Sequence, residues 1–334
     1  MKHQAKIRYT EIHPDIYRIV LPLQGEKPGP VNVYLFKGEQ TTLLDTGIKT
    51  TVNVLEQTLK SIGIGFSDID RIVLSHGHID HYGAARRIVT RSRRRTSVAA
   101  HRDDVGVIET GFDVSNRDFA RFYRLMGVPF LFELLFYSVD WFFSTLAENC
   151  RVDTCLADGE KISLGHYDAT VISTPGHSRG SICLYLEKEG TLFSGDHILG
   201  HITPNAFVMM ESDFDIPWRR SQVEFYDSLK KIEALAPRIV YPAHGNPIHD
   251  LPATASMFRE QFSLRRQKII DILKEGESTV YRIARKLFPE VRGKRLPLEV
   301  FLMVSEIFTH LQVLEKDEIA LSHDRHGKRF FRLA

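Results

Sequence analysis

The feature that most constrains this chain is a cluster of metal-binding side chains directly after a short apolar run. The run RIVLS, residues 71–75, is typical of a buried strand, and HGHIDH follows it at once. Imidazole nitrogens and carboxylate oxygens suit zinc and neighbouring divalent metals. His76 and His78 are one residue apart in a loop leaving the strand and can point the same way, while Asp80 and His81 open the following helix. The motif predicts a strand, loop and helix that bring four metal ligands together.

Three further candidate ligands stand at the ends of later apolar runs. They are His177 in STPGHS, Asp196 in SGDH and His244 in YPAHG. Structural zinc sites are usually closed and rich in cysteine, and none of these candidates is a cysteine. Seven such ligands exceed what one ion needs and match two ions about 3.5 to 4 Å apart, bridged by a carboxylate and a water or hydroxide. The sequence therefore predicts a catalytic centre of two divalent ions, with zinc preferred and manganese or iron(II) as alternatives.

The arrangement of apolar runs indicates an α/β fold. Between residues 16 and 46 the chain contains IYRIVLPL, NVYLF and TTLLDTG, and residues 51–62 have helical spacing. The second half has the same pattern of apolar runs: ATVISTPGHS, SICLYL and TLFSGDHILG, then a helix over 219–235 and the strand IVYPAHG. Two similar halves predict two facing sheets with helices outside, a four-layered αββα sandwich.

One segment, residues 104–149, falls outside this scheme as a helical insertion. Its part from 125 to 143 is unusually apolar, but Pro129, Glu133 and Asp140 interrupt it, so a membrane-spanning helix is disfavoured. Three interpretations stay open: a buried helical pair, a lid that forms an apolar substrate pocket, or the interface of a homodimer.

Residues 253–334 predict a small winged-helix-like domain after a catalytic domain of residues 1–252. Its first amphipathic helix is stopped by Gly276, a second helix has Ser278 as its N-cap, and a third covers residues 298–316. IALSHDRHGKRFFRL then predicts two short strands around an Asp-Arg-His-Gly turn.

Charge gives a weak indication of a nucleic-acid partner. The formal net charge is +2, yet residues 255–334 carry a local surplus of five positive charges. That permits nucleic-acid binding, but dedicated binding domains are usually far more basic. An arginine cluster at positions 86, 87, 91, 93, 94 and 95 is either a solvated helix end or a phosphate-backbone contact.

Cysteine usage and the N-terminus favour a cytoplasmic protein. Cys150, Cys155 and Cys183 are too few and too irregularly spaced for a disulfide framework, which fits a reducing compartment. We interpret Cys155 and Cys183 as core residues. Residues 1–9 are polar and basic with no apolar run behind them, so no secretory signal is visible.

The motifs HGHIDH, TPGHS, SGDH and PAHG, with LLDTG ahead of them, resemble the metallo-β-lactamase superfamily over roughly residues 15–250. The resemblance is greatest to the beta-lactamase-like group, with a glyoxalase II-like catalytic domain and a C-terminal winged-helix-like domain, which includes an endoribonuclease and polyketide thioesterases. The resemblance implies that a first ion is held by His76, His78 and His177, a second by Asp80, His81 and His244, and that Asp196 bridges them.

Neighbouring residues receive separate interpretations. Asp45 in LLDTG is expected to belong to the catalytic site by orienting a ligand histidine, as acids beside metal sites commonly do. Asp80 could also pass a proton to the leaving group. We expect His197 to be a buried hydrogen-bonded residue, while for His201 a substrate contact is one of the interpretations that stay open.

The leading functional prediction is hydrolysis of a small ester, thioester or lactone by a metal-activated hydroxide, with the apolar insertion as a wall for an acyl chain. The first alternative is a phosphodiesterase or endoribonuclease acting on single-stranded nucleic acid. A second is an oxidoreductase of the persulfide dioxygenase type with a single iron, which would leave Asp80, His81 and His244 without a ligand role.

Overall fold

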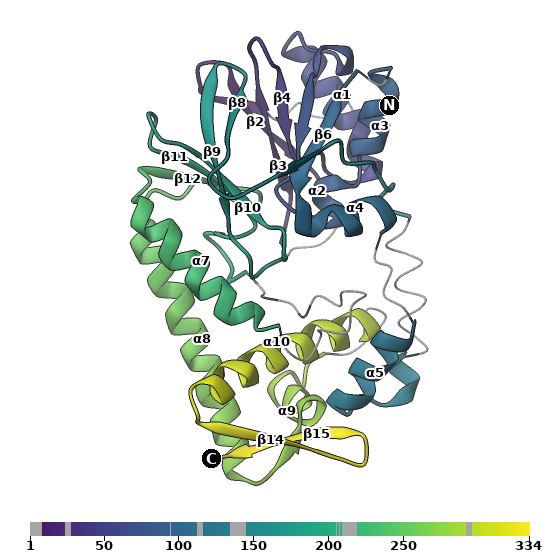
Figure 1. Cartoon of the computed structure of the whole chain (residues 1–334), viewed down its shortest axis with the longest axis vertical. Helices are drawn as coiled ribbons and strands as arrows, with labels where there is room; N and C mark the ends of the chain where they lie inside the picture. Colours follow the sequence, from purple (N-terminus) through teal and green to yellow (C-terminus); the bar gives the residue numbers. More distant parts are fainter. Residues whose placement is uncertain are drawn as a thin grey trace. The chain divides into compact units, whose positions relative to one another are not determined.

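The computed structural model describes residues 9–23, 28–93, 95–111, 116–133, 145–204, 206, 208, 219–291 and 296–334. The chain divides into two compact units (Figure 1). The first comprises Met1–Gly111, Phe143–Pro204 and Ser228–Thr254; the second comprises Phe112–Phe142, Asn205–Asp227 and Ala255–Ala334. The C-terminal residues and most of the insertion therefore belong to one unit.

The first unit contains two sheets. The larger has seven strands in chain order: β1 (Tyr9–His13), β2 (Ile16–Leu21), β3 (Val31–Phe36), β4 (Thr42–Leu44), β5 (Arg71–Val73), β6 (Ser97–His101) and β7 (Thr154–Leu156). Pairing is antiparallel from β1 to β4 and parallel from β4 to β7. The smaller sheet has the order β12-β11-β10-β9-β8, with β8 (Lys161–Leu164), β9 (Tyr167–Ser173), β10 (Ile182–Leu186), β11 (Thr191–Gly195) and β12 (Ile239–Pro242). In this sheet only β11 and β12 pair in parallel.

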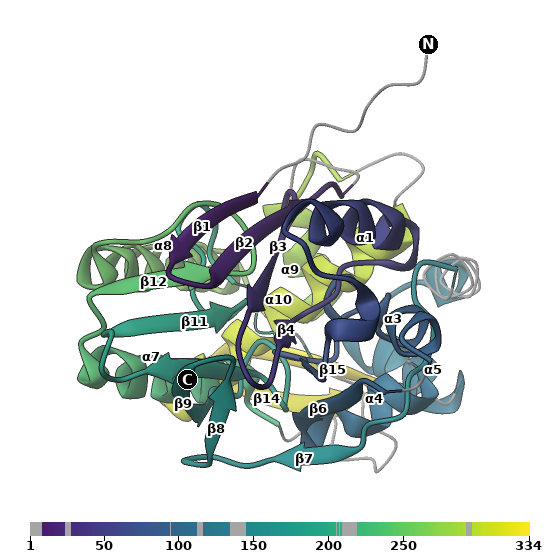
Figure 2. The same cartoon turned by 90° about the horizontal axis from the view of Figure 1, so that it is seen from above.

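The alternation of side chains along β3 shows how the layers form. Val33 and Leu35 join the core under helices α1 (Val52–Ser61) and α3 (Ala85–Arg91), while Tyr34 and Phe36 face the second sheet. The latter two rings lie 4.9 and 5.0 Å from the ring of Phe193 on β11. Figure 2 shows α1 and α3 on the side of the first sheet that faces away from the second.

The other side of the second sheet is covered by the C-terminal part of α7 (Ser221–Leu235), where the Tyr185 hydroxyl donates to the Leu235 carbonyl. Helices, two sheets and helices confirm the predicted αββα sandwich. Cys183 is buried in this unit as predicted, but Cys155 is exposed because it lies in the edge strand β7.

The second unit contains the elements predicted for the C-terminal region. They are α8 (Leu251–Lys274), which begins in the first unit, β13 (Ser278–Thr279), α9 (Val280–Leu287), α10 (Leu296–Lys316), β14 (Ala320–Arg325) and β15 (Lys328–Leu333), with sheet order β13-β15-β14. The hairpin turns at His326 and Gly327, whose φ angles are 52° and 72°. The winged-helix assignment stays a prediction.

The predicted N-cap of the second helix was one residue too early. Ser278 pairs with Phe331 in the sheet, whereas the Thr279 hydroxyl accepts a hydrogen bond from the Arg282 amide. Because α9 begins at Val280, the N-cap position is occupied by Thr279, the last residue of β13.

Part of the apolar insertion is covered within the second unit. Helix α5 (Asn116–Met126) places Phe122 against Phe308 of α10, with ring centroids 6.0 Å apart. Residues 134–144, including Phe136, lie outside the described residues. The buried side chains of α5 agree with the buried-helix interpretation, whereas Phe130 and Leu131 are exposed; a lid or a dimer interface stays a prediction. In the described ranges, no helix combines the length and apolarity needed to cross a membrane.

Candidate metal centre

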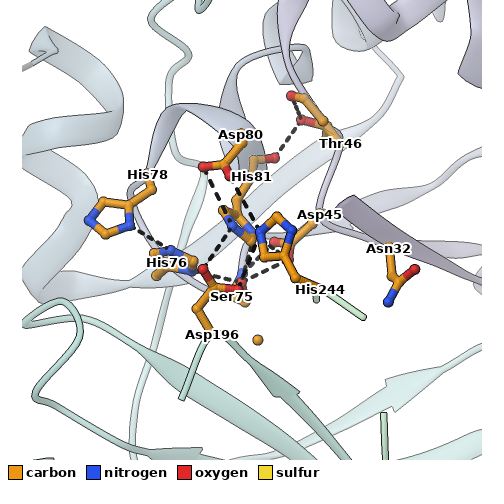
Figure 3. A network of polar contacts seen from close by, with 12 residues as sticks. Asn32, Asp45, Thr46, Ser75, His76, His78, Asp80, His81, Asp196 and His244 are labelled. Carbon is orange, nitrogen blue, oxygen red and sulfur yellow. Dashed lines mark hydrogen bonds and ion pairs between the residues drawn. The ribbon is translucent and has the colours of Figure 1, made fainter. Parts of the chain in front are cut away.

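The fold brings all seven predicted ligands together at strand ends of the two sheets. Figure 3 shows six of them, His76, His78, Asp80, His81, Asp196 and His244. His76 and His78 follow β5, and the short helix α2 (Ile79–Tyr82) begins directly after His78, as predicted. The other ligands follow strands of the second sheet: His177 lies between β9 and β10, Asp196 follows β11, and His244 follows β12. Parallel pairing of β11 and β12 explains why the last two are neighbours.

The first ligand group consists of His76, His78 and His177, whose ligand atoms lie within 4.8 Å of one another. The Nε2 atom of His76 and the Nδ1 atom of His78 are 3.0 Å apart. That separation suits two nitrogens bound to one ion at about 2.0 to 2.1 Å each. Burial, followed by the nearby His177, lowers the pKa of His78 to about 3, and burial holds the pKa of His76 well below its ordinary value. These imidazoles are therefore neutral, as metal ligands must be.

The second ligand group consists of Asp80, His81 and His244. The Asp80 carboxylate lies between the two histidines, with Oδ1 3.6 Å from His81 Nε2 and Oδ2 3.4 Å from His244 Nε2. Although burial raises the pKa of Asp80, the two imidazoles outweigh it and hold that pKa below its ordinary range. Burial alone would lower the pKa of His81, but Asp80, Asp45 and Asp196 raise it well above the ordinary value.

Asp196 reaches both groups. Its Oδ2 atom is 3.5 Å from His177 Nε2 and 3.7 Å from His81 Nε2, and its Oδ1 atom is 3.5 Å from His244 Nε2. In the described part of the chain, the buried Nε2 atoms of His81 and His244 and Oδ1 of Asp196 have no hydrogen-bond partner. Buried polar atoms are normally hydrogen-bonded, so atoms that converge without such partners fit bound cations.

Asp45 contacts His81 and Ser75, the residue before His76, and its catalytic role stays a prediction. Its Oδ2 atom is 2.9 Å from His81 Nδ1, and it accepts hydrogen bonds from the backbone amide and the hydroxyl of Ser75. The Ser75 hydroxyl also lies 3.0 Å from His76 Nδ1. Because Nδ1 of His81 contacts Asp45 and Nδ1 of His76 contacts Ser75, the Nε2 atoms of these two histidines face the centre.

The loop of His244 is held by a residue that the sequence interpretation missed. The Asn32 amide group donates to the carbonyls of Pro242 and Gly245, each at 2.9 Å, and His244 Nδ1 lies 3.0 Å from the Pro30 carbonyl. Asn32 is buried at the start of β3. In the sequence, the feature that could have identified Asn32 is that it is a polar residue at the start of an apolar strand.

The remaining predicted residues lie around the centre. His197 is buried, lies beside the backbone of Ser228 and belongs to none of the ligand groups; burial lowers its pKa to about 3. His201 is exposed, with Nε2 2.9 Å from the Pro28 carbonyl. Its substrate contact stays a prediction.

Three of the five described arginines of the cluster have structural partners. Arg87 pairs with Glu148 at 2.9 Å, Arg91 pairs with Glu56 at 2.6 Å, and Arg86 donates to the Asn149 carbonyl. Arg94 lies outside the described residues. This pairing agrees with the interpretation of the cluster as an ordinary helix end.

Comparison with known proteins decides the family. The model of the metallo-beta-lactamase superfamily matches residues 27–244, a range that includes all seven candidate ligands. The chain belongs to the metallo-beta-lactamase superfamily. Among its relatives is the probable metallo-hydrolase YqjP of Bacillus subtilis, 30% identical over 91% of this chain and 93% of that protein. A second relative, the atrochrysone carboxyl ACP thioesterase of Aspergillus fumigatus, is 25% identical over 52% of this chain and 41% of that protein.

Solved structures of the superfamily share the fold over nearly the whole chain. The family protein TTHA1429 of Thermus thermophilus has a TM-score of 0.80 at 23% identity and covers 96% of this chain and all of that one. A beta-lactamase domain protein of Burkholderia ambifaria has a TM-score of 0.81 at 20% identity, over 99% and 94% of the two chains. This superfamily member is a metal-dependent hydrolase.

Proposed function

We propose that this hydrolase of the metallo-beta-lactamase superfamily works with two divalent ions, zinc in the first place, and cleaves a small ester, thioester or lactone. The observation that carries the dinuclear proposal is the position of Asp196, whose two oxygens lie 3.5 to 3.7 Å from histidines of both ligand groups. A carboxylate in that position can serve two ions at once.

The chain's own residues prepare this centre. When bound, two such ions supply a water whose pKa is lowered toward about 7 and polarise the bond to be hydrolysed. Burial keeps His76 and His78 neutral, and Asp45 holds His81 through its Nδ1 atom. Asn32 fixes the loop that carries His244. The ligands are thus oriented before any ion binds, which reduces the free-energy cost of ordering them when an ion binds.

The substrate class rests on the relatives and on the weakness of the nucleic-acid alternative. One relative carries the name of a thioesterase, which supports an acyl substrate. Phosphate backbones bind available cations, and part of the positive charge of the second unit is already paired: Arg325 with Glu277 at 2.6 Å and Arg329 with Asp324 at 2.8 Å. The arginines of α3 are paired as well. A small molecule is therefore the favoured partner.

A substrate panel tests the proposal. The purified protein, with its metal content measured, is assayed on acyl thioesters, esters, lactones, a phosphodiester and single-stranded RNA. We expect two zinc ions per chain and turnover confined to the acyl substrates, abolished by chelation and restored by zinc. Cleavage of RNA alone would replace this proposal with the nuclease, and one iron per chain with oxygen consumption would replace it with the oxidoreductase.

Asp80→Asn separates two roles of that carboxylate. Because Asp80 lies between His81 and His244, we expect the variant to lose affinity for one ion in a zinc-chelator competition, by more than the roughly 10- to 100-fold typical of residues that only support a ligand, together with its activity. The alternative is the proton-transfer role. Two tightly bound ions in a variant with greatly reduced turnover would favour that role over simple ligation.

A further inference from the structure

Asp104 is a buried carboxylate outside the seven ligands that ties two of their loops together. It ends the short 3-10 helix Arg102–Asp104 after β6, and its side chain is 2% exposed. Its Oδ2 atom accepts hydrogen bonds from the Gly77 amide at 2.7 Å and the Ser178 hydroxyl at 2.8 Å, and its Oδ1 atom accepts one from the Gly180 amide at 2.7 Å.

These partners lie beside the first ligand group. Gly77 stands between His76 and His78, and Ser178 directly follows His177. The two loops leave different sheets, because the first follows β5 and the second connects β9 and β10. A single carboxylate therefore joins the two parts of the first ligand group across the sandwich.

The three hydrogen bonds are what make the buried charge tolerable. An ionised carboxylate is costly to bury unless donors surround it, and hydrogen bonds to a charged acceptor are about twice as strong as neutral ones. No cation of the described residues forms an ion pair with Asp104. Its charge is thus directed at the backbone and hydroxyl groups of the two loops.

The close approach of Asp104 requires the glycine at position 180, and Asp104 together with Val107 requires the one at position 77. A Cβ atom on Gly180 would lie 2.6 Å from the Asp104 carboxyl carbon, and one on Gly77 would lie 3.3 Å from the Asp104 Cβ and closer still to Val107. Neither glycine has a positive φ angle, so space, not backbone conformation, requires them. Both loops are built to receive this side chain.

We propose that Asp104 is a positioning residue that sets the separation of the His76–His78 loop and the His177 loop, and thereby the affinity of the first ligand group for its ion. This inference rests on the proposed function in so far as that function places an ion there. The second ligand group shares none of these three hydrogen bonds and should be little affected.

The test uses the full chain and zinc alone. Asp104→Asn keeps the size of the side chain but turns an NH2 group toward at least one donor, and Ser178→Ala removes one bond from the opposite side. The control is Asp168→Asn, which removes the same charge from an exposed carboxylate of β9 that pairs with Lys188 at 3.0 Å and contacts neither loop. Zinc affinity is measured by chelator competition, and unfolding of the metal-free proteins is measured beside it.

We expect one zinc to be bound about 10- to 100-fold more weakly in Asp104→Asn and less so in Ser178→Ala, with the other zinc and the control unchanged. Lower melting temperatures with unchanged zinc affinity in both variants would overturn the inference, because Asp104 would then serve only the fold. A wild-type protein that binds one zinc, or that hydrolyses nothing in the panel, would instead count against the proposed function. The zinc affinity of each variant is compared with that of the wild type, so this comparison does not depend on whether a substrate is found.

Discussion

Asp196→Ala is expected to reduce kcat/KM by at least about 100-fold and to lower bound metal from two ions toward one per chain. The reason is geometric: one carboxylate lies within 3.7 Å of histidines from both ligand groups, so its removal affects both positions. Metal analysis after gel filtration and initial rates on the best acyl substrate measure the two effects.

The neighbouring residue gives a matched control for Asp196. His197 is equally buried but lies outside the ligand groups, beside the backbone of Ser228. His197→Ala should therefore lower the melting temperature yet retain two ions and most of the turnover at temperatures where it is folded. Full activity and an unchanged metal count in Asp196→Ala would disprove its bridging role, whatever the control shows.

The second large effect concerns the insertion, where Phe122→Ala is expected to destabilise the second unit by about 3 to 5 kcal/mol. Phe122 is almost fully buried and packs on Phe308 of α10, so its loss leaves a cavity in the core that the insertion shares with the C-terminal residues. Chemical unfolding followed by circular dichroism measures the change in the free energy of unfolding.

Phe130→Ala is the matched control in the same segment. Phe130 is 66% exposed, so its removal should change the free energy of unfolding by no more than about 0.5 kcal/mol. Sedimentation of this variant also tests the proposed homodimer, because the exposed side chains of Phe130 and Leu131 would be natural contacts. Equal destabilisation by the two substitutions would contradict the packing of α5 against α10.

Residue type and short spacing were sufficient to predict the ligands from the sequence. HGHIDH places four ligands within six residues, and STPGHS, SGDH and YPAHG each carry one more at the end of an apolar run. Ligand-type side chains at the ends of several apolar runs were enough to expect one centre, and the fold brings them to one edge because β9, β11 and β12 run in the same direction. The same alternation of apolar residues predicted the two sheets. Ser278 was misassigned as a cap because its strand, β13, is only two residues long.

The supporting residues could be recognised only in the tertiary structure. Asp104 is 27 residues from Gly77 and 76 from Gly180, and Asn32 is 213 residues from Gly245, so no local pattern marks either side chain as part of the centre. In the sequence, both are ordinary polar residues. The sequence likewise showed that the insertion is apolar but not what covers it, since Phe308 lies far along the chain from Phe122. Ligand chemistry is a property of single side chains and was readable directly, whereas burial and hydrogen-bond partners depend on which distant segments the fold brings into contact.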